Sequence, residues 1–372
     1  MTDSLKAFRE FSAEDPDFKD VKIKCLDERA RVRESLYVQP LLRQLFFEIT
    51  LNCNEHCFHC GSHCAPGART GLSLEKYREI LDDVKTNIGT KGVQVCLTGG
   101  EPLLRPDFFE LTEYIHSQGF VWGMTTNATL ITKEVAHKLS QTGMGTISVS
   151  IDGLEETHDK QRGLRGGYRR AMNGLQNLIE EGTFKEVQVT TVINHKNINE
   201  LEALYDIFQN IDIDSWRVFG VEPIGRALDH PDMLLTPEDQ RTLFRFIISK
   251  RREGLPVCYG CSHFLGEDIE GNVRDTLFLC NAGLFTASIL ADGSIVACLD
   301  IDRRPELIFG NVMKDQFSQI WKNEFKPYRR HLSQRCAACQ NCEYEKWCAG
   351  GAHHSFDYDK NEQRICLKGV LF

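Results

Sequence analysis

Between residues 45 and 254, short apolar runs alternate with amphipathic stretches of helical periodicity. The runs predict six strands, because β-branched and aromatic residues dominate them, at residues 44–50, 92–98, 120–126, 146–152, 186–193 and 215–221. A strand followed by a helix pairs in parallel with the next strand through a right-handed crossover. Six such units predict an α/β fold, a partial (β/α)6 TIM-like barrel with too few strands to close as eight would.

The stretches between these runs carry the start and stop signals of helices. Segment 72–84 places five apolar side chains along one helical stripe: Leu74, Tyr77, Ile80, Leu81 and Val84. Another predicted helix ends on Gly119, and the last one opens with Thr236-Pro237 and stops at Gly254. In a barrel of this kind, ligands bind at the C-terminal ends of the strands.

The pattern changes beyond Gly254. Residues 285–298 predict two strands around an Asp292-Gly293 turn, and the remainder is loop-rich and dense in cysteine. A segment with so little apolar core needs metal to hold it together. We therefore expect an N-terminal extension at 1–44 without an interpretable motif, the barrel at 45–254 and a small, loop-rich domain at 255–372.

Composition narrows the class of protein. The chain of 372 residues is 41% apolar and 26% charged, which is ordinary for a globular enzyme. No apolar run reaches the ~20 residues that cross a bilayer, and the N-terminus lacks an apolar secretory core. We expect a cytoplasmic protein without membrane contact, and a net charge of −9 without a basic block disfavours nucleic acid as a partner.

The 15 cysteines are too many and too clustered for ordinary packing. A cytoplasmic chain of this size keeps its thiols reduced and folds without disulfides. Four cysteines fall within residues 53–64 and nine within 258–366, and only Cys25 and Cys96 stand apart, as ordinary buried thiols. This clustering predicts metal ligation.

The first cluster, CNEHCFHC, places Cys53, Cys57 and Cys60 in the spacing C-x3-C-x2-C directly after the first strand. Such a loop can turn three thiolates toward one point and leave the fourth corner of a metal cluster open, which is typical of catalysis. A zinc site completed by Cys64 or a histidine is the alternative that the spacing leaves open. Its location at the C-terminal end of a barrel strand favours the catalytic cluster.

CNEHCFHC, with LTGGEP at 97–102 after the second strand, resembles the radical SAM superfamily. The resemblance implies that Cys53, Cys57 and Cys60 bind a [4Fe-4S] cluster whose remaining iron is chelated by S-adenosylmethionine. It also implies that the reduced cluster cleaves the sulfonium to give a 5′-deoxyadenosyl radical, which abstracts a hydrogen atom from the substrate. An electron donor such as flavodoxin or ferredoxin is implied as a partner. Cys64, close to this cluster, is expected to be an inert packed thiol, with hydrogen-atom donation as the alternative.

Further segments resemble the superfamily's SAM-binding motifs. Four residues resemble the second-strand motif, whose glycines admit the methionyl amine and whose acid supports it: Gly99, Gly100, Glu101 and Pro102. Thr126 and Asn127 resemble the TTNG pattern, with Ala128 in place of the glycine. This substitution puts the close approach of that loop in question.

Three residues of the fourth strand fall on alternate positions and are expected to share one face: Ser148, Ser150 and Asp152. They resemble the serine and acid that contact ribose and carboxylate. Arg162 is similar to an arginine that pairs with the methionine carboxylate, and an exposed helix-capping arginine is the alternative. Gly225 and Arg226 resemble the sixth-strand segment that borders the adenine.

Cys280 and Cys298 flank the predicted hairpin in the spacing C-x12-G-x4-C, and the later cysteines continue as C-x2-C-x5-C and end at Cys366. This arrangement resembles the SPASM domain, a C-terminal extension of radical SAM enzymes that holds auxiliary iron–sulfur clusters. A zinc ribbon is the alternative. The SPASM pattern expects a cysteine four residues after Cys348, where this chain has Ala352.

The missing thiol leaves a ligand of the first auxiliary cluster to be found elsewhere. We assign one auxiliary [4Fe-4S] cluster to Cys258, Cys261, Cys280 and Cys298, and the other to Cys339, Cys342, Cys348 and Cys366. Cys336 or His353 is the alternative ligand for the first cluster. Clusters bound fully by protein have no iron free for substrate, so electron relay or structural support is expected of them.

The resemblance implies a peptide substrate made on the ribosome, which the enzyme would crosslink through a thioether or carbon–carbon bond, or oxidise. About fifty residues precede Cys53, fewer than the about 80 to 90 of a leader-binding domain, so a separate leader-binding protein is expected. The alternatives are a maturase of a protein side chain, as in sulfatase maturation, and a modifier of a tetrapyrrole or carbohydrate. A non-catalytic metal-binding interaction protein is the alternative of another class. No catalytic acid or base is predicted.

Overall fold

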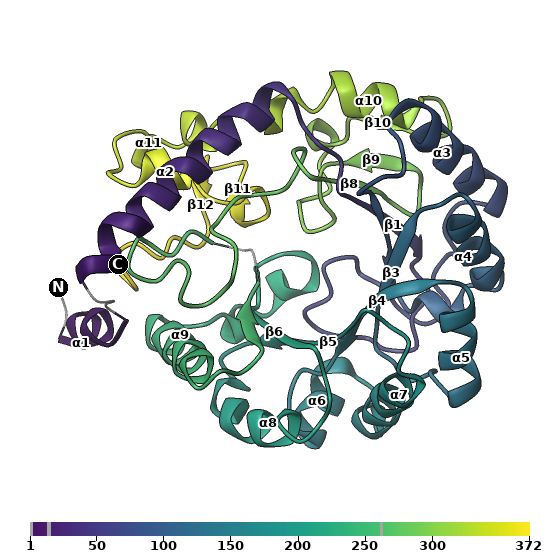
Figure 1. Ribbon diagram of the computed structural model, residues 1–372, viewed down its shortest axis with the longest axis horizontal. Coiled ribbons are helices and arrows are strands. Elements are labelled where there is room, and N and C mark those ends of the chain that lie inside the picture. The colour runs from purple at the N-terminus through teal and green to yellow at the C-terminus, as the bar shows by residue number, and fades with distance from the viewer. Residues whose placement is uncertain (1–2, 13–15, 261–262) are drawn as a thin grey trace.

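The structure, a computed structural model, describes residues 3–12, 16–260 and 263–372 (Figure 1). Parallel strands in chain order form the barrel wall: β1 (Gln44–Thr50), β2 (Gln94–Gly99), β3 (Val121–Thr126), β4 (Met144–Ser150), β5 (Glu186–Ile193), β6 (Ser215–Gly220) and β7 (Val257–Tyr259). The predicted α/β barrel and its six strands are confirmed, and β7 is an additional short strand that the sequence pattern did not predict.

Helices cover the outside of this sheet in a ring (Figure 1). They are α3 (Leu74–Asn87), α4 (Phe108–Ser117), α5 (Lys133–Gln141), α6 (Glu155–Arg162), α7 (Gly167–Glu181), α8 (Leu201–Phe208) and α9 (Pro237–Arg252). The strand residues that face the helices, such as Leu45, Val95 and Val149, are fully buried. The alternate residues face the lumen of the barrel and are half-buried, for example Ser148 and Arg217.

Local sequence signals fix the ends of these helices. The Ser73 side chain accepts a hydrogen bond from the Lys76 amide at 3.2 Å and caps α3, whose five predicted apolar residues are all buried. Thr236 and Asp239 form a reciprocal capping box at the start of α9. The helices therefore begin where the sequence predicted.

The sheet continues beyond residue 254 at both edges. At the far edge, β8 (Thr286–Ile289) pairs in parallel with β1, followed by β9 (Ser294–Val296) and β10 (Gly310–Asn311). The predicted hairpin is confirmed, with Gly293 in the left-handed region at φ 87°. Because one sheet and one apolar core cross residue 255, the predicted division does not coincide with a break in packing.

The N-terminal extension forms α1 (Asp3–Ser12) and α2 (Pro16–Val38). Helix α2 lies beside the C-terminal segment, where the barrel sheet does not close (Figure 1). This segment contains α10 (Phe317–Asn323), α11 (Ala337–Gln340), α12 (Glu345–Cys348), β11 (Phe356–Asp357) and β12 (Glu362–Gln363). Arg33 of α2 donates to the carbonyls of Lys346 and Trp347 at 2.9 and 3.0 Å. The N-terminal extension therefore binds the cysteine-rich segment through these hydrogen bonds.

Within the described ranges, no helix is both long enough and apolar enough to span a bilayer.

Candidate active site

The loop that follows β1 carries the first cysteine cluster at the barrel mouth. Burial raises the pKa of the Cys53 thiol to about 12 and that of the Cys57 thiol well above its usual range, and the charge of Cys60 adds to both shifts. Hydrogen bonding from Cys64 lowers the pKa of Cys60 to about 5. The three predicted ligands are therefore neighbours, and binding iron would replace the protons of Cys53 and Cys57.

The end of β2 approaches this loop very closely. The amides of Gly100 and Glu101 donate to the carbonyls of Thr50 and Asn52 at 2.8 and 2.9 Å. A Cβ at Gly99 would lie 2.1 Å from the Thr50 oxygen, and a Cβ at Gly100 would lie 2.1 Å from the Asn52 oxygen. Both glycines are thus required by contact between two chain segments, a role that the motif alone did not reveal.

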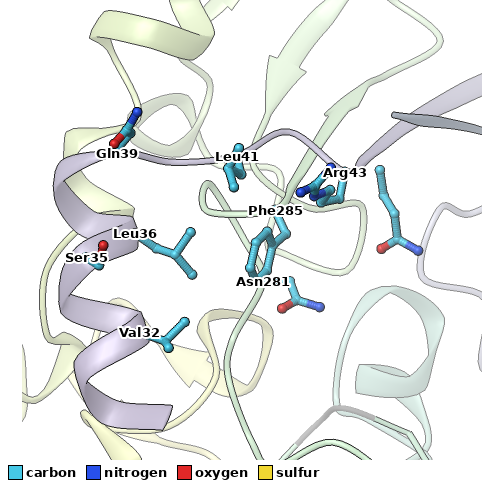
Figure 2. Close-up of a pocket in the computed structure, with 9 residues that line it drawn as sticks. Val32, Ser35, Leu36, Gln39, Leu41, Arg43, Asn281 and Phe285 are labelled. Carbon is cyan, nitrogen blue, oxygen red and sulfur yellow. The ribbon is translucent and has the colours of Figure 1, made fainter. Parts of the chain in front are cut away.

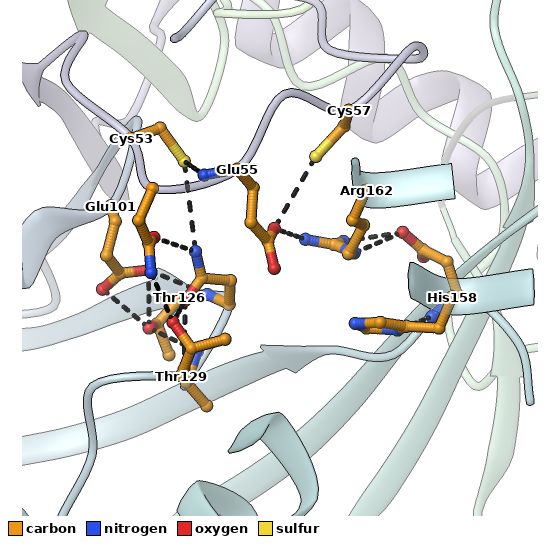
Figure 3. Close-up of polar contacts among 12 residues, drawn as sticks. Cys53, Glu55, Cys57, Glu101, Thr126, Thr129, His158 and Arg162 are labelled. Carbon is orange, nitrogen blue, oxygen red and sulfur yellow. Dashed lines mark hydrogen bonds and ion pairs between the residues drawn. The ribbon is translucent and has the colours of Figure 1, made fainter. Parts of the chain in front are cut away.

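Glu101 joins the ends of two strands to the cysteine loop (Figure 3). Its buried carboxylate accepts hydrogen bonds from the Thr126 hydroxyl at 2.8 Å and the Asn127 amide at 2.9 Å. The Asn127 side chain in turn donates to Asn54 of the loop at 2.8 Å. Burial raises the pKa of Glu101 to about 7, and Pro102 starts a short 3-10 turn behind it. Glu101 therefore has protein partners before any ligand binds.

Ala128 keeps the backbone conformation that a glycine would take in the TTNG pattern. Its φ is 56°, and its side chain is fully buried. The backbone of this loop closely approaches α7, because a Cβ on Gly174 of that helix would lie 2.2 Å from the Ala128 oxygen. The loop is therefore formed without the glycine.

Arg162 lies at the centre of a buried ion-pair network behind the cysteines (Figure 3). Its guanidinium contacts Asp152 at 2.7 Å and Glu55 at 2.9 Å. Burial alone would raise the pKa of Asp152, but the charge of Arg162, the two histidines His59 and His158 and a backbone hydrogen bond together outweigh it, and the pKa is lowered. The expected pairing of Arg162 with the methionine carboxylate stays a prediction, and the exposed-arginine alternative is wrong because Arg162 is buried.

The predicted shared face of the fourth strand is only partly formed. Ser148 and Ser150 are half-buried in the lumen, and the Ser148 hydroxyl lies 2.6 Å from that of Thr190. Asp152 lies beyond the end of β4 and is fully buried toward Arg162. The acid compensates the buried guanidinium and also lies 3.4 Å from His59 of the cysteine loop.

Gly225 and Arg226, after β6, clamp the opposite side of the cysteine loop. The Arg226 guanidinium donates to the carbonyls of Cys57 and Cys64 at 2.7 and 2.9 Å. A Cβ at Gly225, whose φ is 53°, would lie 2.4 Å from the Cys60 carbonyl. These residues therefore position the metal-binding loop, and contact with adenine stays a prediction.

One further contact that supports the cysteine loop was not predicted from the sequence. Arg303, from the segment after β9, pairs with buried Glu48 of β1 and donates to the Ser62 hydroxyl at 2.8 Å. Glu48 also accepts from the Ala291 amide at 3.0 Å. No signal in the sequence indicated this pair, because 255 positions separate Arg303 from Glu48.

The cysteines assigned to the second auxiliary cluster lie together. Burial raises the pKa of Cys339, and Cys336, Cys348 and Cys366 add to the shift. Burial also raises the pKa of Cys348 to about 12, with contributions from Cys366 and Cys342. Cys336 therefore lies with this group and not with the first auxiliary cluster.

The residues assigned to the first auxiliary cluster come from different parts of the fold. Cys280 and Cys298 both pack beside Tyr328. Cys258 instead lies on β7, and the charges that shift its pKa after burial include Arg217 and Arg251 but no cysteine. It pairs in register with Arg217 of β6, and its assignment to one cluster with Cys280 and Cys298 stays a prediction.

The other predicted ligand, Cys261, lies outside the described residues. His353 is better placed than Cys258, because its ring packs on Tyr328 with centroids 4.4 Å apart. Its Nδ1 lies 2.8 Å from the Tyr358 hydroxyl, beside the same group of side chains.

The donor set fits iron–sulfur clusters better than single ions. In the described part of the chain, no three His, Cys, Asp or Glu side chains converge closely enough to hold one metal ion. A zinc site requires such convergence, whereas a four-iron cube distributes its thiolates over separate iron atoms. Cys96 is half-buried on β2, and Cys25 is exposed on α2, so its expected burial is wrong.

One cavity of the described structure is lined in part by Asn281, the residue after Cys280. It has a volume of about 650 Å³ and lies between α2 and the start of β1 (Figure 2). Val32, Leu36, Leu41 and Phe285 give it an apolar wall. None of the predicted site residues lines it.

Comparisons with known proteins agree with this site. The model of the radical SAM superfamily matches residues 47–208, and that of an iron–sulfur cluster-binding domain, SPASM, matches residues 280–343. An AdoMet-dependent heme synthase of Methanosarcina barkeri is 29% identical over 83% of this chain and 90% of its own length. The mycofactocin maturase MftC of Mycobacterium tuberculosis is 31% identical over 82% of this chain and 77% of its own.

Among solved structures, SuiB of Streptococcus suis bound to S-adenosylmethionine superposes with a TM-score of 0.69 at 18% identity. The match covers 88% of this chain and 77% of SuiB. At this identity the likeness shows the shared fold.

Proposed function

The chain belongs to the radical SAM superfamily and carries a SPASM domain, and from this premise we propose that it modifies a ribosomally synthesised peptide. Its cofactors are a [4Fe-4S] cluster with S-adenosylmethionine and auxiliary iron–sulfur clusters. When bound, they supply one-electron chemistry that removes a hydrogen atom from the substrate. A crosslink or an oxidation of the peptide would follow.

The supported cysteine loop is the observation that carries the radical chemistry of this proposal, and the likeness to the mycofactocin maturase supports the peptide substrate. Cys53, Cys57 and Cys60 would hold the radical cluster, since they are neighbours at the C-terminal ends of the strands. The loop is fixed from β2, from α6 and from the segment after β6. Rigid support of this kind orients ligands and excludes water from the site.

We propose that the auxiliary clusters divide between two groups of side chains. Cys339, Cys342, Cys348 and Cys366 would hold one, and Cys280 and Cys298 with His353 would contribute to the other. Cys261 stays a prediction. Flavodoxin or ferredoxin would supply electrons, and a separate protein would present the leader of the peptide.

The test is anaerobic reconstitution with candidate precursor peptides, reductant and S-adenosylmethionine, followed by mass analysis. We expect a peptide that has lost two hydrogen atoms, and Cys57→Ala should abolish both this product and cleavage of S-adenosylmethionine. Efficient cleavage without a change in any peptide would contradict the peptide assignment.

A second candidate function has its own support. The heme synthase relative matches over 90% of its length, which favours an iron tetrapyrrole with acidic side chains as the alternative substrate. The same reconstitution with an iron coproporphyrin should then yield a lighter porphyrin, while the peptides return unchanged.

A further inference from the structure

We propose that Arg217, in the barrel lumen, binds a carboxylate of the substrate; this inference rests on the proposed function. Arg217 is the third residue of β6, between Trp216 and Val218, which are buried against the outer helices. Alternation along the strand therefore turns Arg217 into the lumen. It pairs in register with Thr190 of β5 and Cys258 of β7.

The guanidinium reaches well into the lumen. Burial raises the pKa of Cys96 on β2 to about 12, and Arg217 is the charge that opposes this shift from the other side of the barrel. Arg217 also acts on Cys258. The positive charge is thus close to β2, β5 and β7 at once.

The protein balances this charge with neutral groups, among them the Phe219 ring, whose centroid lies 5.9 Å from the guanidinium carbon. Nη2 of Arg217 donates to the Thr190 hydroxyl at 3.3 Å, and its buried Nε has no hydrogen-bond partner among the described residues. No carboxylate of the described ranges lies within ion-pair distance of it. Other buried arginines of this chain are paired: Arg162 with Asp152, Arg105 with Asp107 and Arg274 with Glu270.

The acids nearest to the lumen are engaged elsewhere. Glu186 accepts from Ser215 at 2.8 Å and from Gln188 at 3.2 Å, and Glu48 pairs with Arg303. Other contacts in the lumen join uncharged side chains, such as Gln94 and Thr146. A half-buried guanidinium in neutral surroundings is best compensated by an anion.

A carboxylate is the anion that this geometry fits. The planar guanidinium fork binds carboxylates through two parallel hydrogen bonds. From Arg217, Thr190 and Ser148 lead along the lumen toward Ser150 at the end of β4. An acid held at Arg217 would therefore leave the rest of the substrate directed toward the cysteine loop. A porphyrin propionate and a peptide carboxylate share this chemistry.

The experiment measures binding to the anaerobically reconstituted holoenzyme. The probes are coproporphyrin III against its tetramethyl ester, and a dye-labelled peptide with a free C-terminal carboxylate against its amide. We expect wild type to bind at least one acid more tightly than its neutral form. Arg217→Gln should weaken the binding of that acid by about 10 to 100-fold, and Arg217→Lys should weaken it by less. Neither substitution should change the binding of the neutral form.

Arg170→Gln, on the exposed surface of α7, is the matched control and should bind as wild type. If Arg217→Gln weakens the binding of only one of the two acids, that acid identifies the source of the carboxylate. The inference is overturned if wild type does not prefer either acid, or if Arg217→Gln binds both as wild type does. Cleavage of S-adenosylmethionine should survive in Arg217→Gln, and its absence from wild type would overturn the proposed function separately.

Discussion

The left-handed conformation of Ala128 is a local source of strain beside the cysteine loop. A residue with a Cβ pays roughly 1 kcal/mol in this region relative to glycine. Ala128→Gly should therefore raise the free energy of unfolding by about 0.5 to 1 kcal/mol, which thermal denaturation at a fixed scan rate would detect. Ala203→Gly, within helix α8, is the control and should lower stability by about as much. A decrease with both substitutions would contradict the assigned strain.

His158 makes stability depend on pH. It is fully buried, its Nδ1 accepts from the Asp152 amide at 3.1 Å, and burial followed by the Arg162 charge lowers its pKa to about 4. Below about 6.5 the unfolded chain takes up a proton that the folded chain refuses, so stability is complete above that pH and falls as the pH approaches 4. The total effect is up to about 3 kcal/mol.

Melting temperatures at pH 7.5 and 5.5 check this prediction. His158→Asn keeps an acceptor and loses the titration, so its melting temperature should change less between the two values. His116→Asn, at an exposed position, should behave as wild type. Equal pH dependence in His158→Asn and wild type would be the contrary result.

Site residues could be predicted from the sequence where they belong to a short local motif. The side-chain partners of these residues could not be predicted. The three cysteines, Glu101 and Arg226 follow from short segments of sequence. The partners of Arg162 come from positions 55 and 152, and only the fold brings those carboxylates together. The guanidinium therefore supports the cysteine loop through Glu55, a role that the sequence motif did not indicate.

Strands and helices were predictable to the extent that they repeat a pattern. β1 to β6 each carry enough alternating residues to define a strand, and their ends lie within two residues of the predicted ones. β7 and β10 have 3 and 2 residues, which is too short for any period to appear. The pairing of β8 with β1 depends on contacts across the whole barrel, so it could not be deduced locally.

The segment after β6 should control how firmly the cysteine loop holds its cluster. Arg226→Gln removes the donors to the Cys57 and Cys64 carbonyls and leaves every thiol in place. Loss of such outer support costs about 10 to 100-fold in metal affinity or activity. We expect the signal of the radical cluster, identified by its response to S-adenosylmethionine in electron paramagnetic resonance, to be lost faster under chelator. Arg170→Gln should lose the cluster signal at the wild-type rate. Equal rates in all three proteins would show that Arg226 does not support the cysteine loop.

At the scale of the whole molecule, three parts of the chain close one ring. The sheet spans most of it, and α2 and the C-terminal segment fill the side where the strands do not meet (Figure 1). The polar contacts of Asp27 and Arg33 on α2 with α12 join residues that are more than 300 positions apart in the sequence. The extension without a motif is thus part of the architecture.

This arrangement predicts where the molecule opens first. Arg33→Ala removes the hydrogen bonds to the Lys346 and Trp347 carbonyls, and a bond of this charged type contributes about 1.5 to 3 kcal/mol. Amide hydrogen exchange in residues 337–348 should then accelerate by about 10 to 100-fold, because local opening becomes easier, while β2 to β5 keep their protection. Arg31→Ala, which breaks only an exposed pair with Glu28 on the same helix, should leave both regions unchanged. If exchange in the barrel strands accelerates equally, the cysteine-rich segment and the barrel unfold as one unit, and the division at residue 255 has no counterpart in stability.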